Sequence, residues 1–309
     1  MKNKIFFILY SIDKNIHKIY SSYIMKTYKK LFLVLILGIF ALSSVLAFGA
    51  KDVTDSLEQV IYPTRIVSLG AASTEILFAV GAGDQIVART DFCNYPEEAS
   101  EIPSLGGFDG KTFSLESIIA YKPDFVVLFA GMHDHLIEPL KKYEIQYFVS
   151  DANSIDHVLA EIQEIGKITG HESEAAALVG DIESAINNLA FSSSKTVYWE
   201  IWNAPYMSIG STSFINELIS KAGGTNIFGD VEQSYPSVSE ESIIARNPDV
   251  IFIPSDAMTS VEDVKNRNGW QDISAVKNDK IFIINADITS RSGPRIKDAI
   301  LLINEFLAK

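Results

Sequence analysis

The pattern of apolar and polar positions predicts strands that alternate with helices. Short apolar runs rich in β-branched residues, typical of buried parallel strands, are separated by stretches with apolar residues at three-and-four spacing. The predicted strands are residues 65–70, 85–89, 124–129, 145–150, 196–202, 249–254 and 280–285. Such alternation indicates βαβ units with mainly parallel sheets, which places the chain in the α/β class.

One long stretch interrupts this alternation. Between residues 154 and 190 the apolar positions keep helical spacing without a strand, which predicts a long linking helix. Gly170 is the candidate point for a break or kink in it. The predicted organisation is therefore an N-terminal lobe over residues 50–153, the linking helix over 154–190 and a C-terminal lobe over 191–309.

Two fifteen-residue segments are near copies of each other. Residues 114–128 read SLESIIAYKPDFVVL and residues 239–253 read SEESIIARNPDVIFI, with eight of fifteen positions identical. Each copy reads as a short helix that ends before a proline and leads into an apolar strand. We therefore expect the two lobes to be related versions of one plan.

The N-terminus carries the pattern of an export signal. Three lysines precede an apolar run at residues 31–48, and small residues follow it. We expect residues 1–49 to be a signal peptide region with the true start at Met25 and cleavage near Gly49. An uncleaved membrane anchor is the alternative, because about 18 apolar residues can just span a bilayer.

Charge and cysteine content narrow the function classes. Residues 1–49 hold seven lysines and one aspartate, so the rest of the chain keeps 19 basic and 38 acidic residues, a net charge of −19. Such a body is not expected to bind nucleic acid or anionic lipid. Cys93 is the single cysteine, so this chain alone forms no disulfide and holds no iron–sulfur cluster. No cysteine stands directly after the apolar run, so a lipoprotein anchor is not expected and the predicted location is the periplasm.

The order of several motifs resembles one protein family. These motifs are RIVSLGAASTEILFAVGAGDQIVA, DFCNYPEEA, FSLESIIAYKPDFVV, GGTNIFGD, VSEESIIARNPDVIFI and SRSGPRIKDAI, and they run from about residue 65 to the end. The chain resembles the substrate-binding proteins of ABC importers for iron–siderophores, haem and vitamin B12, with the cobalamin binders the nearest match. The resemblance implies two Rossmann-like lobes joined by a single long helix, with the ligand in a cleft between them. It also implies a monomer that is not an enzyme.

The resemblance assigns a role to the repeated glutamates. In this family a glutamate on each lobe docks into an arginine pocket on one half of the permease, and Glu116 and Glu241 occupy those positions. A carboxylate on a short helix offers bidentate geometry to an arginine. The alternative is that both are first-turn residues favoured by the helix dipole.

The resemblance also implies a set of ligand-binding residues. A large planar chelate needs apolar faces and a few orienting polar groups. The resemblance places aromatic candidates at Phe92, Phe108, Phe129 and Tyr235 and polar candidates at Asp287 and Arg291. Trp202 and Tyr206, near the first strand of the second lobe, are further aromatic candidates. The alternative to ligand binding is a packing role for the aromatic residues and an ion pair within the lobe for Asp287 and Arg291. Arg295 is expected to be structural.

The candidate cleft departs from a cobalamin site in its aromatic types. Phenylalanine or tyrosine stands at Phe108, Phe129 and Tyr235, where the cobalamin binders carry tryptophan. This keeps a ferric siderophore or haem open as the ligand. Haem would use Tyr95, Tyr206 or Tyr235 as its axial ligand. In either case no cofactor is expected beyond the ligand, a cobalt or iron chelate.

Three other classes fit the sequence less well. A zinc or manganese binder would use His133 and His135, but no histidine occurs after His171, so the second lobe could add only carboxylates. Against an enzyme, the Gly-Ala-Gly at residues 81–83 follows a helix rather than a strand, and no Gly-x-Ser-x-Gly is present. A binding module without a transporter would leave both repeated glutamates unexplained.

Overall fold

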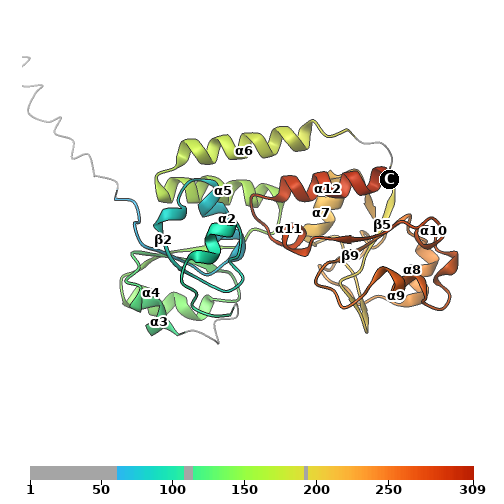
Figure 1. Cartoon of the computed structure of the whole chain (residues 1–309), viewed down its shortest axis with the longest axis horizontal. Helices are drawn as coiled ribbons and strands as arrows, with labels where there is room; N and C mark the ends of the chain where they lie inside the picture. The colour runs from blue at the N-terminus through green and yellow to red at the C-terminus, as the bar shows by residue number, and fades with distance from the viewer. Residues whose placement is uncertain (1–60, 108–113, 191–193) are drawn as a thin grey trace, which may run out of the picture. The chain divides into compact units, whose positions relative to one another are not determined.

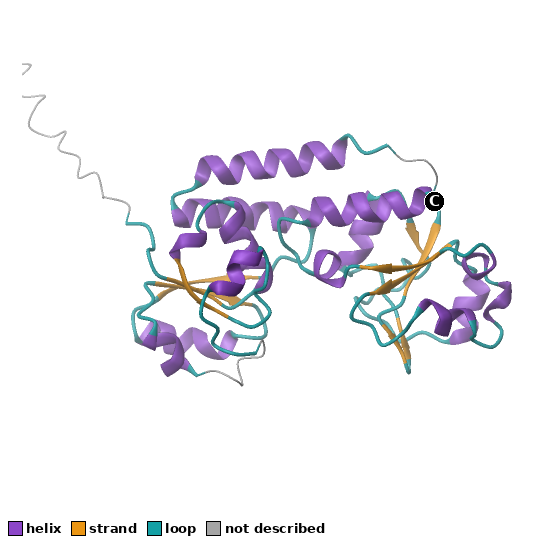
Figure 2. Ribbon diagram, viewed as in Figure 1, coloured by secondary structure: helices purple, strands orange, loops and turns teal. Residues whose placement is uncertain are grey.

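The seven predicted strands, together with one short strand that was not predicted, β8, form two parallel four-stranded sheets, one from the chain before the linking segment and one from the chain after it (Figures 1 and 2). The first sheet has the order β2 (Ile86–Arg89), β1 (Ile66–Ser68), β3 (Phe125–Phe129), β4 (Gln146–Ser150). The second has the order β10 (Ile281–Ile284), β9 (Val250–Pro254), β5 (Thr196–Trp199), β8 (Thr225–Asn226). The α/β class and the two lobes are therefore confirmed.

This computed structural model describes residues 61–107, 114–190 and 194–309. The predicted signal region, residues 1–49, and the candidate Phe108 lie outside the described residues. In the described part, none of the helices combines the length and the apolar character needed to span a membrane.

Helices flank both sheets (Figure 2). The first lobe contains α2 (Ala71–Ala79), α3 (Leu115–Ala120), α4 (Ile137–Lys142) and the 3₁₀ turns Gly83–Gln85, Glu97–Glu101 and Asp134–Leu136. The second contains α7 (Phe214–Lys221), α8 (Glu240–Arg246), α9 (Val261–Lys265), α10 (Ser274–Lys277), α11 (Ala286–Ser290), α12 (Ile296–Ala308) and the 3₁₀ turn Trp270–Asp272. The strand predicted over residues 196–202 is shorter than expected, because the chain leaves it to form the antiparallel hairpin β6 (Trp202–Asn203) and β7 (Tyr206–Met207).

The two repeated segments fold alike. Each forms a short helix, α3 or α8, that is followed by the apolar strand β3 or β9. The serine before each helix is its N-cap: Ser114 Oγ accepts a hydrogen bond from the Ser117 N–H at 3.3 Å, and Ser239 Oγ accepts one from the Ser242 N–H at 3.2 Å. The repeat is therefore one helix-to-strand unit that is used once in each lobe.

The aspartate that both copies share, Asp124 in the first and Asp249 in the second, makes the same contacts in each lobe. Asp124 Oδ2 accepts hydrogen bonds from the backbone N–H and the hydroxyl of Thr64 at 2.8 and 2.9 Å. Asp249 Oδ2 accepts the same pair from Thr196 at 2.9 and 2.8 Å. Because each threonine lies at the start of a lobe's first strand, each aspartate fastens that strand to its neighbour.

The linking segment differs from the expected single long helix. It forms two helices that pack together, α5 (Ile155–Thr169) and α6 (Glu172–Asn187). Gly170 ends α5 in the left-handed conformation, with φ of 79°, which glycine adopts without strain and which stops the helix. A side chain at Gly166 would clash with Ala175 of α6, so glycine also permits the close contact of the two helices.

The linking helices join the lobes through a shared core. Helix α5 contacts α2 of the first lobe and α7 of the second, and α6 contacts α2 and α12. One cluster of buried apolar side chains accordingly includes Ile66 and Val127 of the first sheet, Ile162 of α5, and Val197 and Phe252 of the second sheet. The Glu217 carboxylate of α7 also accepts a hydrogen bond from the Ile155 N–H at the start of α5, at 2.9 Å.

Candidate functional site

Two neighbouring hollows open at the carboxyl ends of the parallel strands, the edge where ligands bind in folds of this class. The smaller has a volume of about 350 Å³ and is lined from both lobes, so it is a cleft between them. The larger, about 630 Å³, is lined by the C-terminal lobe. Asp256 and Ser290 line both hollows, which makes them adjacent compartments of one cleft.

The smaller hollow brings together four of the predicted ligand-binding residues. Phe92 and Phe129 line it from the N-terminal lobe, and Asp287 and Arg291 line it from the C-terminal lobe. Phe92 is 55% exposed and Phe129 36%, values that are high for phenylalanine and leave ring surface open to a ligand.

The larger hollow holds two more predicted residues, Trp202 and Tyr235, which are 41% and 54% exposed. The indole N–H of Trp202 donates a hydrogen bond to the Ala204 carbonyl at 2.9 Å, so its ring is held within the β6–β7 hairpin. Met207 and Ile215, which we did not predict, add apolar surface to this wall.

Tyr206 is not among the residues that line the two hollows. Its ring packs against Trp270 with centroids 5.8 Å apart, and the Arg267 guanidinium lies 5.1 Å from its centroid. Its hydroxyl donates a hydrogen bond to Glu240 at 3.3 Å, and burial together with this carboxylate raises its pKa. The structure therefore gives Tyr206 a packing role inside the C-terminal lobe.

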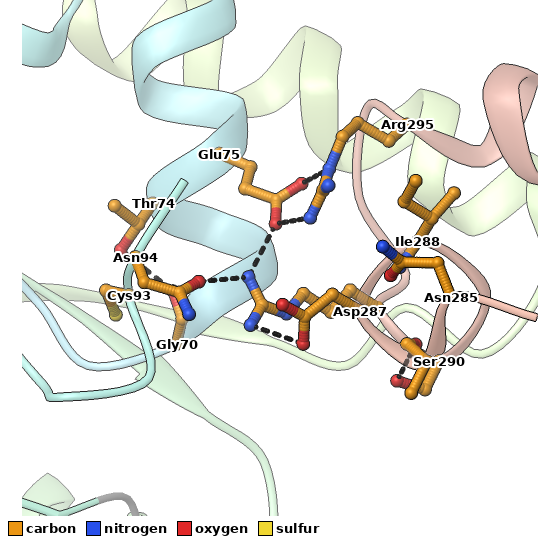
Figure 3. Close-up of polar contacts among 12 residues, drawn as sticks. Gly70, Thr74, Glu75, Cys93, Asn94, Asn285, Asp287, Ile288, Ser290 and Arg295 are labelled. Atoms are coloured by element: carbon orange, nitrogen blue, oxygen red, sulfur yellow. Dashed lines mark hydrogen bonds and ion pairs between the residues drawn. The ribbon is translucent and has the colours of Figure 1, made fainter. Parts of the chain in front are cut away.

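An ion network around Glu75, Asp287 and Arg295 bridges the lobes (Figure 3). Arg291 takes part in it. One of its terminal nitrogens donates to Glu75 of α2 and to Asn94, both at 2.9 Å, and the other donates to Asp287 at 2.8 Å. The ion pair within the lobe that was the alternative for Asp287 and Arg291 is thus present. Arg291 also binds the opposite lobe, so its donors are largely committed to protein groups.

Glu75 is the centre of this network. Its side chain is 1% exposed and also receives Arg295, whose Nε and Nη2 donate at 2.7 and 2.6 Å (Figure 3). The Arg295 guanidinium lies 3.9 Å from the centroid of the Tyr95 ring, a cation–π contact. Two arginines of the C-terminal lobe therefore hold one buried carboxylate of the N-terminal lobe.

The two repeated glutamates lie outside the cleft, on helices α3 and α8. Both are fully exposed second residues of their helices, one in each lobe (Figure 1). The hydrogen bond with the Ser114 side chain lowers the pKa of Glu116, and hydrogen bonds with its own backbone N–H and with Ser239 lower the pKa of Glu241. Both side chains therefore present charged carboxylates to solvent at neutral pH.

A metal-ion site is not apparent in the described part of the chain, where no group of three or more His, Cys, Asp or Glu side chains is placed to hold an ion. His133 is buried, and its Nδ1 accepts a hydrogen bond from the Phe129 N–H at 3.0 Å. It therefore ties the loop that follows β3 to the end of this strand, where Phe129 lies.

Residues 66–288 match the family model described as periplasmic binding protein. The chain belongs to this family. Among curated members, the vitamin B12-binding protein of Vibrio cholerae is 28% identical over 265 residues, covering 82% of this chain and 93% of that protein. The family relationship predicted from the motif order is thus confirmed.

Solved structures of the periplasmic binding protein family show the same fold. A possible iron-binding protein from Staphylococcus epidermidis matches with a TM-score of 0.72 at 28% identity, covering 81% of this chain and all of the other (100%). The periplasmic vitamin B12-binding protein of Vibrio cholerae matches with a TM-score of 0.66 at 26% identity, covering 80% and 97%.

Proposed function

We propose that the protein is the substrate-binding component of an ABC importer, which captures cobalamin or a related corrinoid in the cleft and delivers it to a permease in the membrane. The observation that carries this proposal is the lining of the cleft, where exposed aromatic rings come from both lobes. The one arginine among the described lining residues is already paired with protein carboxylates. No chemistry is done on the ligand.

The size and character of the cleft support a large, flat ligand. Compartments of about 350 and 630 Å³ lie within the range of small-molecule sites. Phe92 and Phe129 on one side and Trp202 and Tyr235 on the other offer ring faces to a macrocycle, which such faces bind through apolar contact.

The charges of the cleft favour a corrinoid over haem. A corrinoid carries neutral amides at its edge, which donate hydrogen bonds to carboxylates, whereas haem carries two propionates that need cationic partners. Among the described residues that line the hollows, Arg291 is the one cation, and Glu75 and Asp287 already occupy it. The similarity to the Vibrio cholerae vitamin B12-binding protein supports the same choice.

The exposed glutamates support the role in transport. Glu116 and Glu241 occupy the same position in two copies of one structural unit, which suits a permease with two like halves. A cell-surface module without a transporter would need neither. We further propose that the protein acts as a monomer in the periplasm after cleavage of residues 1–49.

An iron chelate is the second candidate, and Tyr235 is the observation that favours it. Of the three tyrosines considered as axial haem ligands, Tyr235 alone lines the two hollows, because Tyr95 lies under Arg295 and Tyr206 packs on Trp270. The similarity to a possible iron-binding protein also points to this class.

Two substitutions at Tyr235 separate the candidates. If the ring stacks on a corrinoid, we expect Tyr235→Phe to bind cyanocobalamin within about twofold of the wild type and Tyr235→Ala to bind roughly tenfold more weakly, since burying an aromatic ring contributes about 1.5 kcal/mol or more. Calorimetric titration of the purified protein measures both.

Tyr143→Ala is the matched control, because Tyr143 is a similarly exposed tyrosine (56%) that does not line the hollows. It should leave cyanocobalamin affinity unchanged. Saturable haemin binding that Tyr235→Phe abolishes, in a protein that ignores cyanocobalamin, would instead establish the second candidate.

A further inference from the structure

Asp256 lies where the two compartments of the cleft meet. It lines both hollows and directly follows Pro254 and Ser255 at the carboxyl end of β9, one of the two central strands of the second sheet. Nothing in the sequence motifs had drawn attention to it. A ligand that fills both compartments must pass this side chain.

The backbone on either side of Asp256 is fixed. The Ser255 N–H donates to the Ile284 carbonyl at 2.8 Å, and Ser255 Oγ accepts from the Ala286 N–H at 3.1 Å. The Ala257 N–H donates to the Pro254 carbonyl at 3.0 Å, which closes a tight turn. The backbone that carries Asp256 is therefore fixed at the junction before a ligand arrives.

Asp256 is also the carboxylate that the ion network leaves uncompensated. Within the network, Glu75 and Asp287 are balanced by Arg291 and Arg295. The exposed Asp256 makes neither a hydrogen bond nor an ion pair with another side chain in the described ranges. The described lining of the cleft thus has an excess of one negative charge, located at Asp256.

We infer that Asp256 is a specificity-determining residue, which accepts a hydrogen bond from an amide N–H at the edge of a corrinoid and disfavours a carboxylate at the same place. The inference rests on the proposed function and goes beyond it, because it assigns discrimination between amide and acid to one residue. An ionised carboxylate can only accept hydrogen bonds, so an amide pairs with it whereas an acid repels it.

The test compares cyanocobalamin with its monocarboxylic acids, in which one edge amide has been hydrolysed. At pH 7 the wild-type protein should bind at least one of these acids on the order of 10- to 100-fold more weakly than the amide. Asp256→Asn keeps the shape and an acceptor oxygen but loses the charge. It should therefore weaken cyanocobalamin binding about threefold, because a neutral acceptor replaces a charged one, and reduce the difference in affinity between the amide and the acid to about threefold.

Asp84→Asn, the same change at an exposed site of the N-terminal lobe outside the hollows, is the matched control and should keep the wild-type difference in affinity. The role of Asp256 would be overturned if the wild type bound cyanocobalamin and its acids equally well, or if Asp256→Asn kept the full difference in affinity between them. In both cases, binding of cyanocobalamin itself would still uphold the proposed function. A protein that binds none of these corrinoids would overturn both.

Discussion

Replacing both docking glutamates by lysine, Glu116→Lys with Glu241→Lys, should abolish uptake and leave ligand affinity intact. In the docking that we propose, each lysine would present a positive charge to an arginine pocket on one half of the permease, so neither half would be correctly engaged. Accumulation of radiolabelled cyanocobalamin by cells that express the protein with its permease measures uptake. Titration of the purified variant measures affinity.

A control variant separates docking from total charge. Glu164→Lys with Glu183→Lys makes the same change in net charge at exposed positions on α5 and α6. In Figure 1, α6 lies at the top of the molecule, whereas α3 and α8 lie in the lower half of the molecule. This variant should transport normally. Loss of ligand affinity in the docking variant, or uptake that persists in it, would contradict the role of Glu116 and Glu241.

Removing the charge of Glu75 should destabilise the protein more than any other single change in the cleft. Glu75→Gln leaves Arg291 and Arg295, which are 11% and 13% exposed, without their shared carboxylate. Breaking a buried ion pair from one side costs about 3 kcal/mol or more of unfolding free energy. For a protein of this size that corresponds to a fall in Tm of roughly 6 to 12 °C, measurable by calorimetry.

Asp287→Asn provides the comparison, because Asp287 pairs with the same arginine but is 51% exposed. Exposed partners contribute little, so we expect this change to cost less than about 1 kcal/mol. Equal Tm values for the Glu75 and Asp287 variants would show that the network does not hold the lobes together.

The fold was largely predictable because local and long-range signals agree. The apolar runs that became β3 and β9 are short and have no polar position, a pattern that favours buried parallel strands. The repeated prolines marked the ends of the short helices in the two copies, and the structure shows that Ser114 and Ser239 cap their starts. The break at Gly170 was noted as a candidate, but spacing alone does not distinguish a kink from two packed helices, because both keep the same apolar face.

The candidate site was less predictable, since its residues meet only in three dimensions. Tyr206 and Trp202 lie in one short hairpin, yet Tyr206 packs on Trp270 whereas Trp202 lines the cleft. This difference depends on the geometry of the hairpin. Glu75 was missed, although a lone acidic residue in the apolar helix AASTEILFA is itself a signal of a buried partner. Asp256 carried only the signal of its place at the end of a strand.

Calorimetric titration of the purified protein with cyanocobalamin, haemin and ferric siderophores decides which class of chelate it binds. We expect saturable binding of one cyanocobalamin per protein, with haemin binding far more weakly because its propionates meet Asp256 and an arginine that is already paired. Tight binding of haemin or a ferric siderophore without a response to cyanocobalamin would contradict the assignment of a corrinoid.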